Sequence, residues 1–488
     1  WFSSFFLEET KHSRFLSFQF GFKSYHVIKC EMQMLSLKKL LLLCLCLPAL
    51  AIAEVSEYQL DNGLKLLVKP DDRAPVVVSQ VWYKVGSSYE HNGITGISHI
   101  LEHMMFKGTK NLAPGEFSEI IAANGGSQNA FTGRDYTAYF QTLEKDRLEV
   151  SFRLEAERMR NLIIDETELF KERDVVSEER RMRTDDNPQA LMREAFNATA
   201  FMNSPYHHPV IGWMSDINHY QKADLDDWYQ KWYAPNNAVV VVVGDVEPDA
   251  VYQLAKKYFG PLKPEQTATV KPQVEVEQRG ERYLKLKAPA QLPYLMMGWK
   301  VPVITTAEND WEPYALDVLS GILSGTSSSR FSKELVRDQQ VAAGVSAYNN
   351  NFSRLDDMFV IGGTPAQGKS IDALQKAIQA QLDTLKMTPV SDAELQRVKT
   401  QVVASEVYEL DSVFYQAMQL GMLETVGLDW RLSEQYVDNI KAVTAEQVQQ
   451  VVQKYFIDDR LTVGELVPIA NPDNNPPQAM ASGDPHAR

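Results

Sequence analysis

The pentapeptide His99-Ile-Leu-Glu-His103 constrains the fold of this chain more than any other segment. Residues four apart on an α-helix lie on the same face, one turn apart. Two imidazoles at this spacing can bind one Zn²⁺ ion, and a carboxylate between them can act as a base on a water molecule. We therefore predict a helix over residues 95–106 in which His99 and His103 are metal ligands and Glu102 is a catalytic base.

The N-terminal region has the pattern of a cleavable signal peptide. Two lysines precede an apolar run over residues 40–50, and Ala51-Ile-Ala53 fits a small-residue cleavage site. The run is too short for a stable membrane anchor. We expect the signal to begin at Met34 and the mature chain to begin at about Glu54, in the periplasm or outside the cell. Residues 1–33 then look like translated upstream sequence.

A catalytic zinc site needs a third protein ligand and keeps one position open. Glutamates are frequent between residues 155 and 194, and spacing alone does not choose among them. All three cysteines precede residue 54, so a cysteine ligand and a disulfide framework are both excluded in the mature chain.

Length and charge set the domain organisation and exclude some partners. At 488 residues the chain is too long for one hydrophobic core, and its net charge of −15 argues against nucleic acid or an anionic membrane as partner. We divide it into an upstream segment with the signal peptide (1–53), an N-terminal zinc domain (54–260), a linker (261–280), a homologous C-terminal domain (281–470) and a disordered tail (471–488).

Both halves show the same order of predicted elements, which suggests an internal duplication. In the first half, Asp61-Asn-Gly63 separates two short strands as in a β-hairpin, and five consecutive valines at 239–243 indicate a strand buried on both faces. Residues 127–143 alternate like an exposed strand that turns back. Long helices are predicted over 145–162, 166–183, 371–385 and 392–423.

Four segments resemble the pitrilysin/insulinase family of zinc metallopeptidases, the inverzincins, and especially its mitochondrial processing peptidase-like branch in a bacterial periplasmic form. They are residues 99–109, 124–132, 172–179 and 236–245, and the resemblance extends over about residues 55–470. It implies an α+β fold of two homologous α/β-sandwich domains, each a mixed sheet covered by helices, arranged like a clam around an enclosed chamber. It also implies one Zn²⁺ per chain and hydrolysis of peptide bonds.

The resemblance assigns further site residues. Glu179 lies 76 residues after His103, the separation at which the family places its third zinc ligand, and Glu178 stays open as the alternative. Glu172, two helical turns before Glu179, is expected to support catalysis from beside the zinc ligands. Asn129 and Ala130 are expected to bind substrate, because an exposed strand edge can pair with an extended peptide.

The second half departs from the family pattern. The family's C-terminal domain usually supplies an Arg and a Tyr to the substrate. Aligned from Ser328-Ser-Arg330, the two positions are Val336 and Ala343, seven residues apart. We therefore expect a heterodimer in which a second pitrilysin-like chain supplies that pair. The predicted function is a periplasmic endopeptidase for unstructured peptides or short proteins, and the alternative is a catalytically silent scaffold or binding subunit of the same fold.

Overall fold

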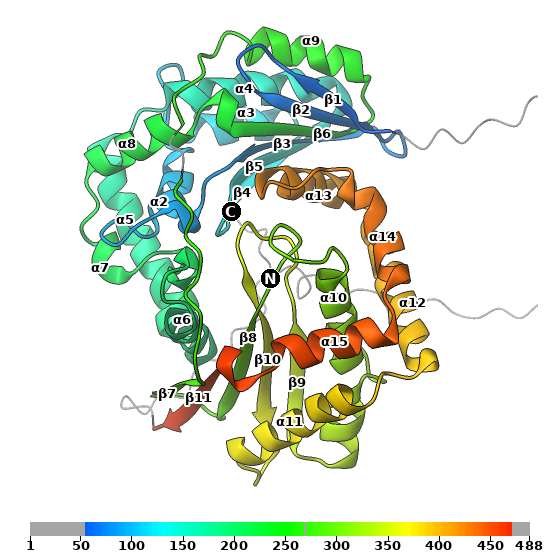
Figure 1. Cartoon of the computed structure of the whole chain (residues 1–488). Helices are drawn as coiled ribbons and strands as arrows, with labels where there is room; N and C mark the ends of the chain where they lie inside the picture. Colours follow the sequence, from blue (N-terminus) through cyan, green and yellow to red (C-terminus); the bar gives the residue numbers. More distant parts are fainter. Residues whose placement is uncertain (1–53, 268–269, 471–488) are drawn as a thin grey trace, which may run out of the picture. The chain divides into compact units, whose positions relative to one another are not determined.

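Two mixed β-sheets organise the chain, which is described by a computed structural model over residues 54–267 and 270–470 (Figure 1). The predictions for the signal peptide and for the C-terminal tail concern residues 1–53 and 471–488, which lie outside the described residues.

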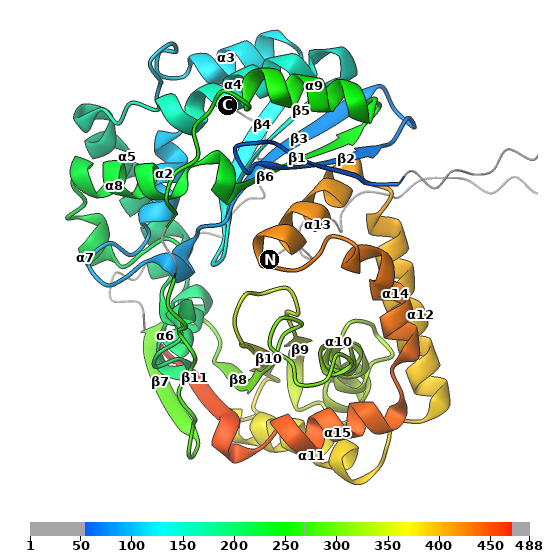
Figure 2. The same ribbon diagram turned by 45° about the horizontal axis from the view of Figure 1, so that its top comes forward.

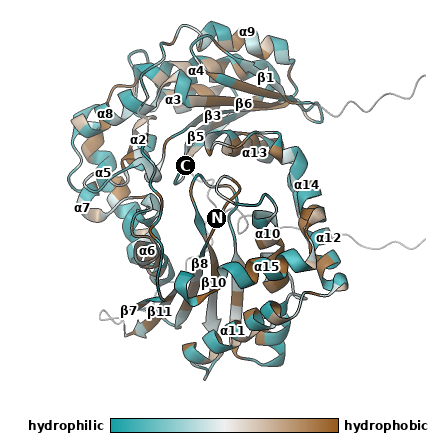
Figure 3. Cartoon of the chain, in the orientation of Figure 1, coloured by the Kyte–Doolittle hydropathy of each residue, from teal (hydrophilic) through white to brown (hydrophobic). Residues whose placement is uncertain are grey.

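The first sheet has six strands in the order β1-β2-β6-β3-β5-β4. Only β2 and β6 run parallel; every other neighbouring pair is antiparallel. The valine-rich β6 lies between β2 and β3 and is buried along its whole length, as its sequence predicts. Figure 3 shows the hydrophobic colour along β6. The strands are β1 (Ser56–Gln59), β2 (Lys65–Pro70), β3 (Val76–Tyr83), β4 (Ser127–Thr132), β5 (Thr137–Glu144) and β6 (Ala238–Gly244).

The second sheet has five strands in the order β7-β11-β8-β10-β9, with β7 and β11 parallel and the rest antiparallel. This order matches β2-β6-β3-β5-β4 strand for strand, in the same order along the chain. The matching topology confirms the predicted fold class of two homologous α/β domains. The strands are β7 (Arg282–Pro289), β8 (Tyr294–Val301), β9 (Ala342–Tyr348), β10 (Asp357–Pro365) and β11 (Leu461–Ile469).

Helices build a core on one face of each sheet. The core of the first sheet uses α2 (Ile97–Met104), α3 (Glu116–Ala123), α4 (Leu148–Asn161), α5 (Glu166–Arg180), α7 (Met214–Ile217), α8 (Lys222–Trp232) and α9 (Pro248–Tyr258). The core of the second uses α10 (Glu312–Leu323), α11 (Ile371–Met387), α12 (Asp392–Glu409), α14 (Leu432–Ala442) and α15 (Ala445–Tyr455). A π-helical turn, η3 (Arg181–Asp185), follows α5, and a second π-helical segment, η6 (Phe331–Asp338), precedes β9.

Each half also covers the other half's sheet with one helix (Figures 1 and 2). Helix α13 (Val413–Thr425) packs on the first sheet, where its Gly421 lies so close to Trp82 that a Cβ atom would be 2.1 Å from the indole Nε1. Helix α6 (Pro188–Ala200) packs on the second sheet through Met192 and Phe196. This exchange of helices between the halves is not among the features predicted from the sequence. The predicted domain boundaries remain predictions.

The prediction of one continuous helix over residues 392–423 is wrong. Helix α12 ends at Glu409 and α13 begins at Val413. The side chain of Ser412 accepts a hydrogen bond from the backbone N–H of Tyr415, which is the contact of a helix N-cap. The break frees α13 to turn onto the first sheet.

The predicted linker is extended over its described residues and is tied to the first half. The carboxylate of Glu275 accepts hydrogen bonds from the successive backbone N–H groups of Met202, Asn203 and Ser204, just after α6. In the two described ranges, no helix is long and apolar enough to cross a membrane.

Candidate active site

Helix α2 carries the His-x-x-Glu-His motif and is fixed at its N-terminus. The carboxylate of Glu90 accepts hydrogen bonds from the backbone N–H groups of Gly96 and Ser98, at 2.6 and 2.9 Å. These N–H groups have no partner within the helix, and Glu90 satisfies two of them. The apolar face of α2 enters the first core. The motif side chains lie on the opposite face, where they contact Glu179 of α5 and Thr132 of β4.

His99, His103 and Glu179 converge between α2 and α5. His99 Nε2 lies 3.8 Å from Glu179 Oε1, and His103 Nε2 lies 3.5 Å from Glu179 Oε2. One ligand atom from each residue lies within 4.8 Å of the others. Ligand atoms held tetrahedrally around zinc at about 2.0–2.1 Å are about 3.4 Å apart. The three side chains would therefore fit Zn²⁺ after a small movement of their ligand atoms toward one another. Glu178 instead pairs with Arg181 at the surface, 2.9 Å away.

Glu172 supports His103 from the opposite side of its ring. Glu172 Oε2 lies 3.1 Å from His103 Nδ1, and Glu172 Oε1 lies 2.6 Å from Lys107 Nζ. The contact holds the imidazole with Nε2 toward Glu179, the arrangement commonly seen for histidines that bind metals. Glu172 thus contacts one of the two predicted histidine ligands directly. By contrast, His99 Nδ1 is buried and has no hydrogen-bond partner among the described residues.

The electrostatics of the motif side chains differ sharply. Burial lowers the pKa of His99 to about 4 and raises that of Glu102 to about 7. Burial opposes charge on His103 too, but hydrogen bonds to Glu172 and Glu179 raise its pKa to about 9. Burial likewise opposes charge on Glu179, but the hydrogen bond from His103 and nearby positive charges lower its pKa to about 2. Glu102 is therefore the carboxylate of this group that holds a proton most readily.

Strand β4 forms the free edge of the first sheet beside α2, and it carries Asn129 and Ala130. The backbone N–H of Ala130 donates to Asn129 Oδ1, at 2.9 Å. The outer edge of β4 has no neighbouring strand in the sheet, and an extended peptide can add a strand at such an edge. The edge position of both residues is the one that the sequence predicts.

Three residues near the motif were missed from the sequence. Thr132, at the end of β4, donates a 2.5 Å hydrogen bond to Glu102 Oε2. Arg183, in the π-helical turn after α5, lies 2.8 Å from Glu179 Oε1. Lys107 follows His103 by four residues, and its contact with Glu172 brings a positive charge beside that carboxylate.

In the second half, the positions that correspond to the family's Arg and Tyr offer no such chemistry. Val336 lies in η6 and packs against the second core, and Ala343 is exposed near the start of β9. The neighbouring Arg337 donates to the carbonyl of Ser327, and Tyr348 lies at the far end of β9.

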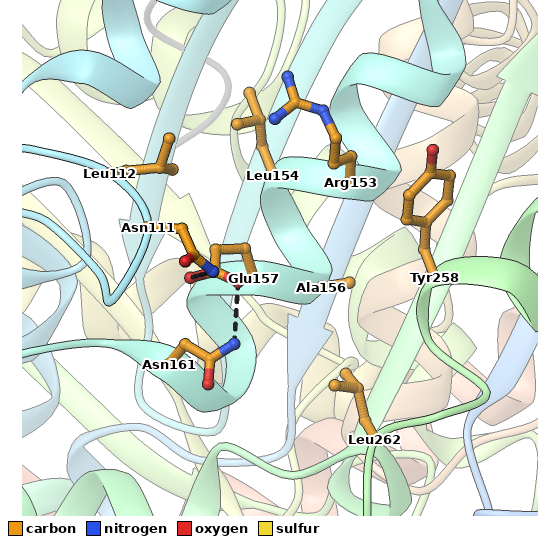
Figure 4. A pocket seen from close by; sticks show the side chains of 9 residues that line it. All are labelled: Asn111, Leu112, Arg153, Leu154, Ala156, Glu157, Asn161, Tyr258 and Leu262. Atoms are coloured by element: carbon orange, nitrogen blue, oxygen red, sulfur yellow. Dashed lines mark hydrogen bonds between the residues drawn. The ribbon is translucent and has the colours of Figure 1, made fainter.

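A surface pocket of about 330 Å³ lies away from these residues (Figure 4). Glu157 in this pocket already accepts hydrogen bonds from the side chains of Thr109, Asn111 and Asn161. None of the predicted site residues lines it. The lining residues are Asn111, Leu112, Arg153, Leu154, Ala156, Glu157, Asn161, Tyr258 and Leu262.

Comparison with known proteins finds matches to two family models, to curated relatives and to a solved structure. Residues 65–212 match the family model "Insulinase (Peptidase family M16)", and residues 219–402 match "Peptidase M16 inactive domain". Zinc protease PqqE of Helicobacter pylori is 38% identical over 360 residues, which span 72% of this chain and 79% of that protein. An uncharacterized zinc protease of Bacillus subtilis, YmxG, is 27% identical over 407 residues, 83% of this chain and 96% of that protein. The crystal structure of a protease from Helicobacter pylori superposes with a TM-score of 0.80 at 33% identity, covering 85% of this chain and 100% of that one.

Proposed function

Because the chain belongs to the insulinase family of peptidases, peptidase family M16, we propose that it is a zinc-dependent endopeptidase. The observation that carries the proposal is the convergence of His99, His103 and Glu179, beside the half-buried carboxylate of Glu102. Two histidines and one carboxylate with a fourth position open are the ligand set of a catalytic zinc site.

The protein residues divide the work of hydrolysis. When bound at these ligands, zinc supplies a Lewis acid that polarises the scissile carbonyl and makes water more acidic. Glu102 accepts a proton from the attacking water at its free carboxylate oxygen, and later delivers it to the nitrogen of the leaving amine. Glu172 keeps the ring of His103 oriented through the hydrogen bond at Nδ1.

The substrate is an unstructured peptide or a short protein. An extended segment pairs with the free edge of β4 at Asn129 and Ala130, so recognition depends mainly on peptide backbone groups. Sequence preference should therefore be loose. Folded proteins cannot offer a free extended segment, and an enclosed chamber would exclude them as well.

We further propose that the chain acts as the catalytic subunit of a heterodimer. Val336 and Ala343 stand where related enzymes carry an Arg and a Tyr, so a second pitrilysin-like chain would supply that pair. The signal pattern before Glu54 favours the periplasm or the cell exterior.

A catalytically silent scaffold of the same fold is the second candidate. The family model that matches residues 219–402 is described as an inactive domain, and this favours it. All proposed zinc ligands, however, lie in the part that matches the other model, residues 65–212.

One experiment separates these functions. The protein is purified from its native host with any bound partner, and hydrolysis of an unstructured peptide library is measured with and without a zinc chelator. We expect chelator-sensitive hydrolysis that Glu102→Gln abolishes while zinc stays bound, and that Glu178→Gln leaves intact. Hydrolysis that survives Glu102→Gln would refute the assignment of the base, and absence of hydrolysis in the wild-type preparation would favour the scaffold.

A further inference from the structure

We infer that Thr132 is a positioning residue that holds the carboxylate of Glu102 in place for proton transfer. The inference rests on the proposed peptidase function. Its structural basis is the hydrogen bond of 2.5 Å from Thr132 Oγ1 to Glu102 Oε2, which joins the end of β4 to α2.

Glu102 depends on this contact for its orientation. In the described parts of the chain, Thr132 is the one residue that donates a hydrogen bond to the Glu102 carboxylate. A glutamate side chain has several rotatable bonds, and a half-buried carboxylate that lacks a hydrogen-bond donor is destabilising. Fixing Oε2 on Thr132 leaves Oε1 free to take the proton of the attacking water. Small errors in the position of a catalytic group can cost orders of magnitude in rate.

Thr132 is itself held firmly. It pairs with Thr137 of β5, and the following turn is closed by a 2.8 Å hydrogen bond from Gly133 N to the carbonyl of Tyr136. The Ser87 N–H donates to the carbonyl of Gly133, so the turn is fixed from the other side as well. Threonine is β-branched, which restricts rotation about χ1 and so keeps the hydroxyl aimed.

The contact also links the base to the substrate edge. Asn129 and Ala130 lie in the same strand as Thr132. One strand, β4, therefore positions both a peptide that pairs with it and the carboxylate of Glu102. Loss of the hydroxyl should disturb the chemical step and leave peptide binding almost unchanged.

Thr132→Val tests this, because valine has nearly the same shape and lacks the hydroxyl. We expect kcat to fall about 10- to 100-fold, with KM changed by less than about twofold and zinc content unchanged. Thr132→Ser keeps the hydroxyl and should retain kcat within about threefold of wild type. Equal loss in Thr132→Ser and Thr132→Val, or no loss in either, would overturn the inference.

A second measurement does not depend on activity. In the zinc-free protein, Thr132→Val should lower Tm by about 2–4 °C, because it leaves the half-buried Glu102 carboxylate without its donor. In a Glu102→Met background the same substitution should change Tm by less than about 1 °C. Equal shifts in both backgrounds would contradict the inference alone, whereas a wild-type enzyme without hydrolysis would contradict the proposed function.

Discussion

The contact between Glu172 and His103 predicts how strongly the proposed site binds zinc. Glu172 is 7% exposed, accepts a hydrogen bond from His103 Nδ1, and pairs with Lys107. Burial opposes charge on Glu172, but these two partners lower its pKa, so it is a carboxylate in the folded protein. In Glu172→Gln the side chain keeps its shape and loses its charge. Its amide NH₂ group then faces either His103 Nδ1 or Lys107 Nζ, and that donor loses its acceptor.

The size of the effect follows from the hydrogen bonds that are weakened. Hydrogen bonds to charged groups contribute about 1.5–3 kcal/mol, and neutral ones contribute about 0.5–1.5 kcal/mol. The substitution should therefore remove about 1–2 kcal/mol from the support of His103. At about 1.4 kcal/mol for each factor of ten, the zinc dissociation constant should rise about 5- to 30-fold. Outer residues that orient metal-binding histidines have effects of this order.

Competition with a chromophoric chelator measures this constant directly. Glu178→Gln is the matched control: the side chain is 57% exposed and pairs with Arg181, so its zinc affinity should equal that of wild type. If Glu172→Gln binds zinc as tightly as wild type, Glu172 does not orient His103 in the way described.

Two further predictions concern stability. Gly421→Ala should destabilise the protein by about 1–3 kcal/mol, because the added Cβ would lie 2.1 Å from Trp82 Nε1. The control Gly344→Ala meets no described atom within 4 Å and should destabilise the protein by less than about 0.5 kcal/mol. Equal urea midpoints for the two variants would contradict this prediction. Burial raises the pKa of Asp317 to about 6 from 3.8, so the folded state keeps this proton longer than the unfolded state, and stability is lost as pH rises from about 4 to about 6. The free energy of unfolding is measured at pH 4 and at pH 7, and its decrease between the two should be smaller in Asp317→Asn by on the order of 1–3 kcal/mol. An unchanged decrease would contradict this prediction.

The parts of the fold that the sequence predicts are those encoded within one element. The valines at 239–243 form a strand buried on both faces, and the motif from His99 to His103 lies on a helix, because both patterns are local. The exchange of α6 and α13 depends on which sheet receives an apolar helix face. Residues such as Phe196 show that one face of the helix is apolar, but they do not show which sheet that face packs against.

The candidate site shows the same division. Spacing alone left the third ligand open, and the choice of Glu179 over Glu178 needed the family pattern; in the structure Glu179 lies beside the histidines and Glu178 lies outside the group. Thr132 and Glu102 are 30 residues apart, and their contact follows from the packing of β4 beside α2. A threonine at a strand end carries no local mark of such a role.

In the proposed function, His99, His103 and Glu179 together hold a catalytic zinc ion. The most direct test is the zinc content and peptide hydrolysis of Glu179→Gln after dialysis against a chelator, with Glu178→Gln treated in parallel. We expect wild type and Glu178→Gln to retain about one zinc per chain and full hydrolysis, and Glu179→Gln to lose both. A Glu179→Gln protein that keeps its zinc and still cleaves peptides would contradict this expectation.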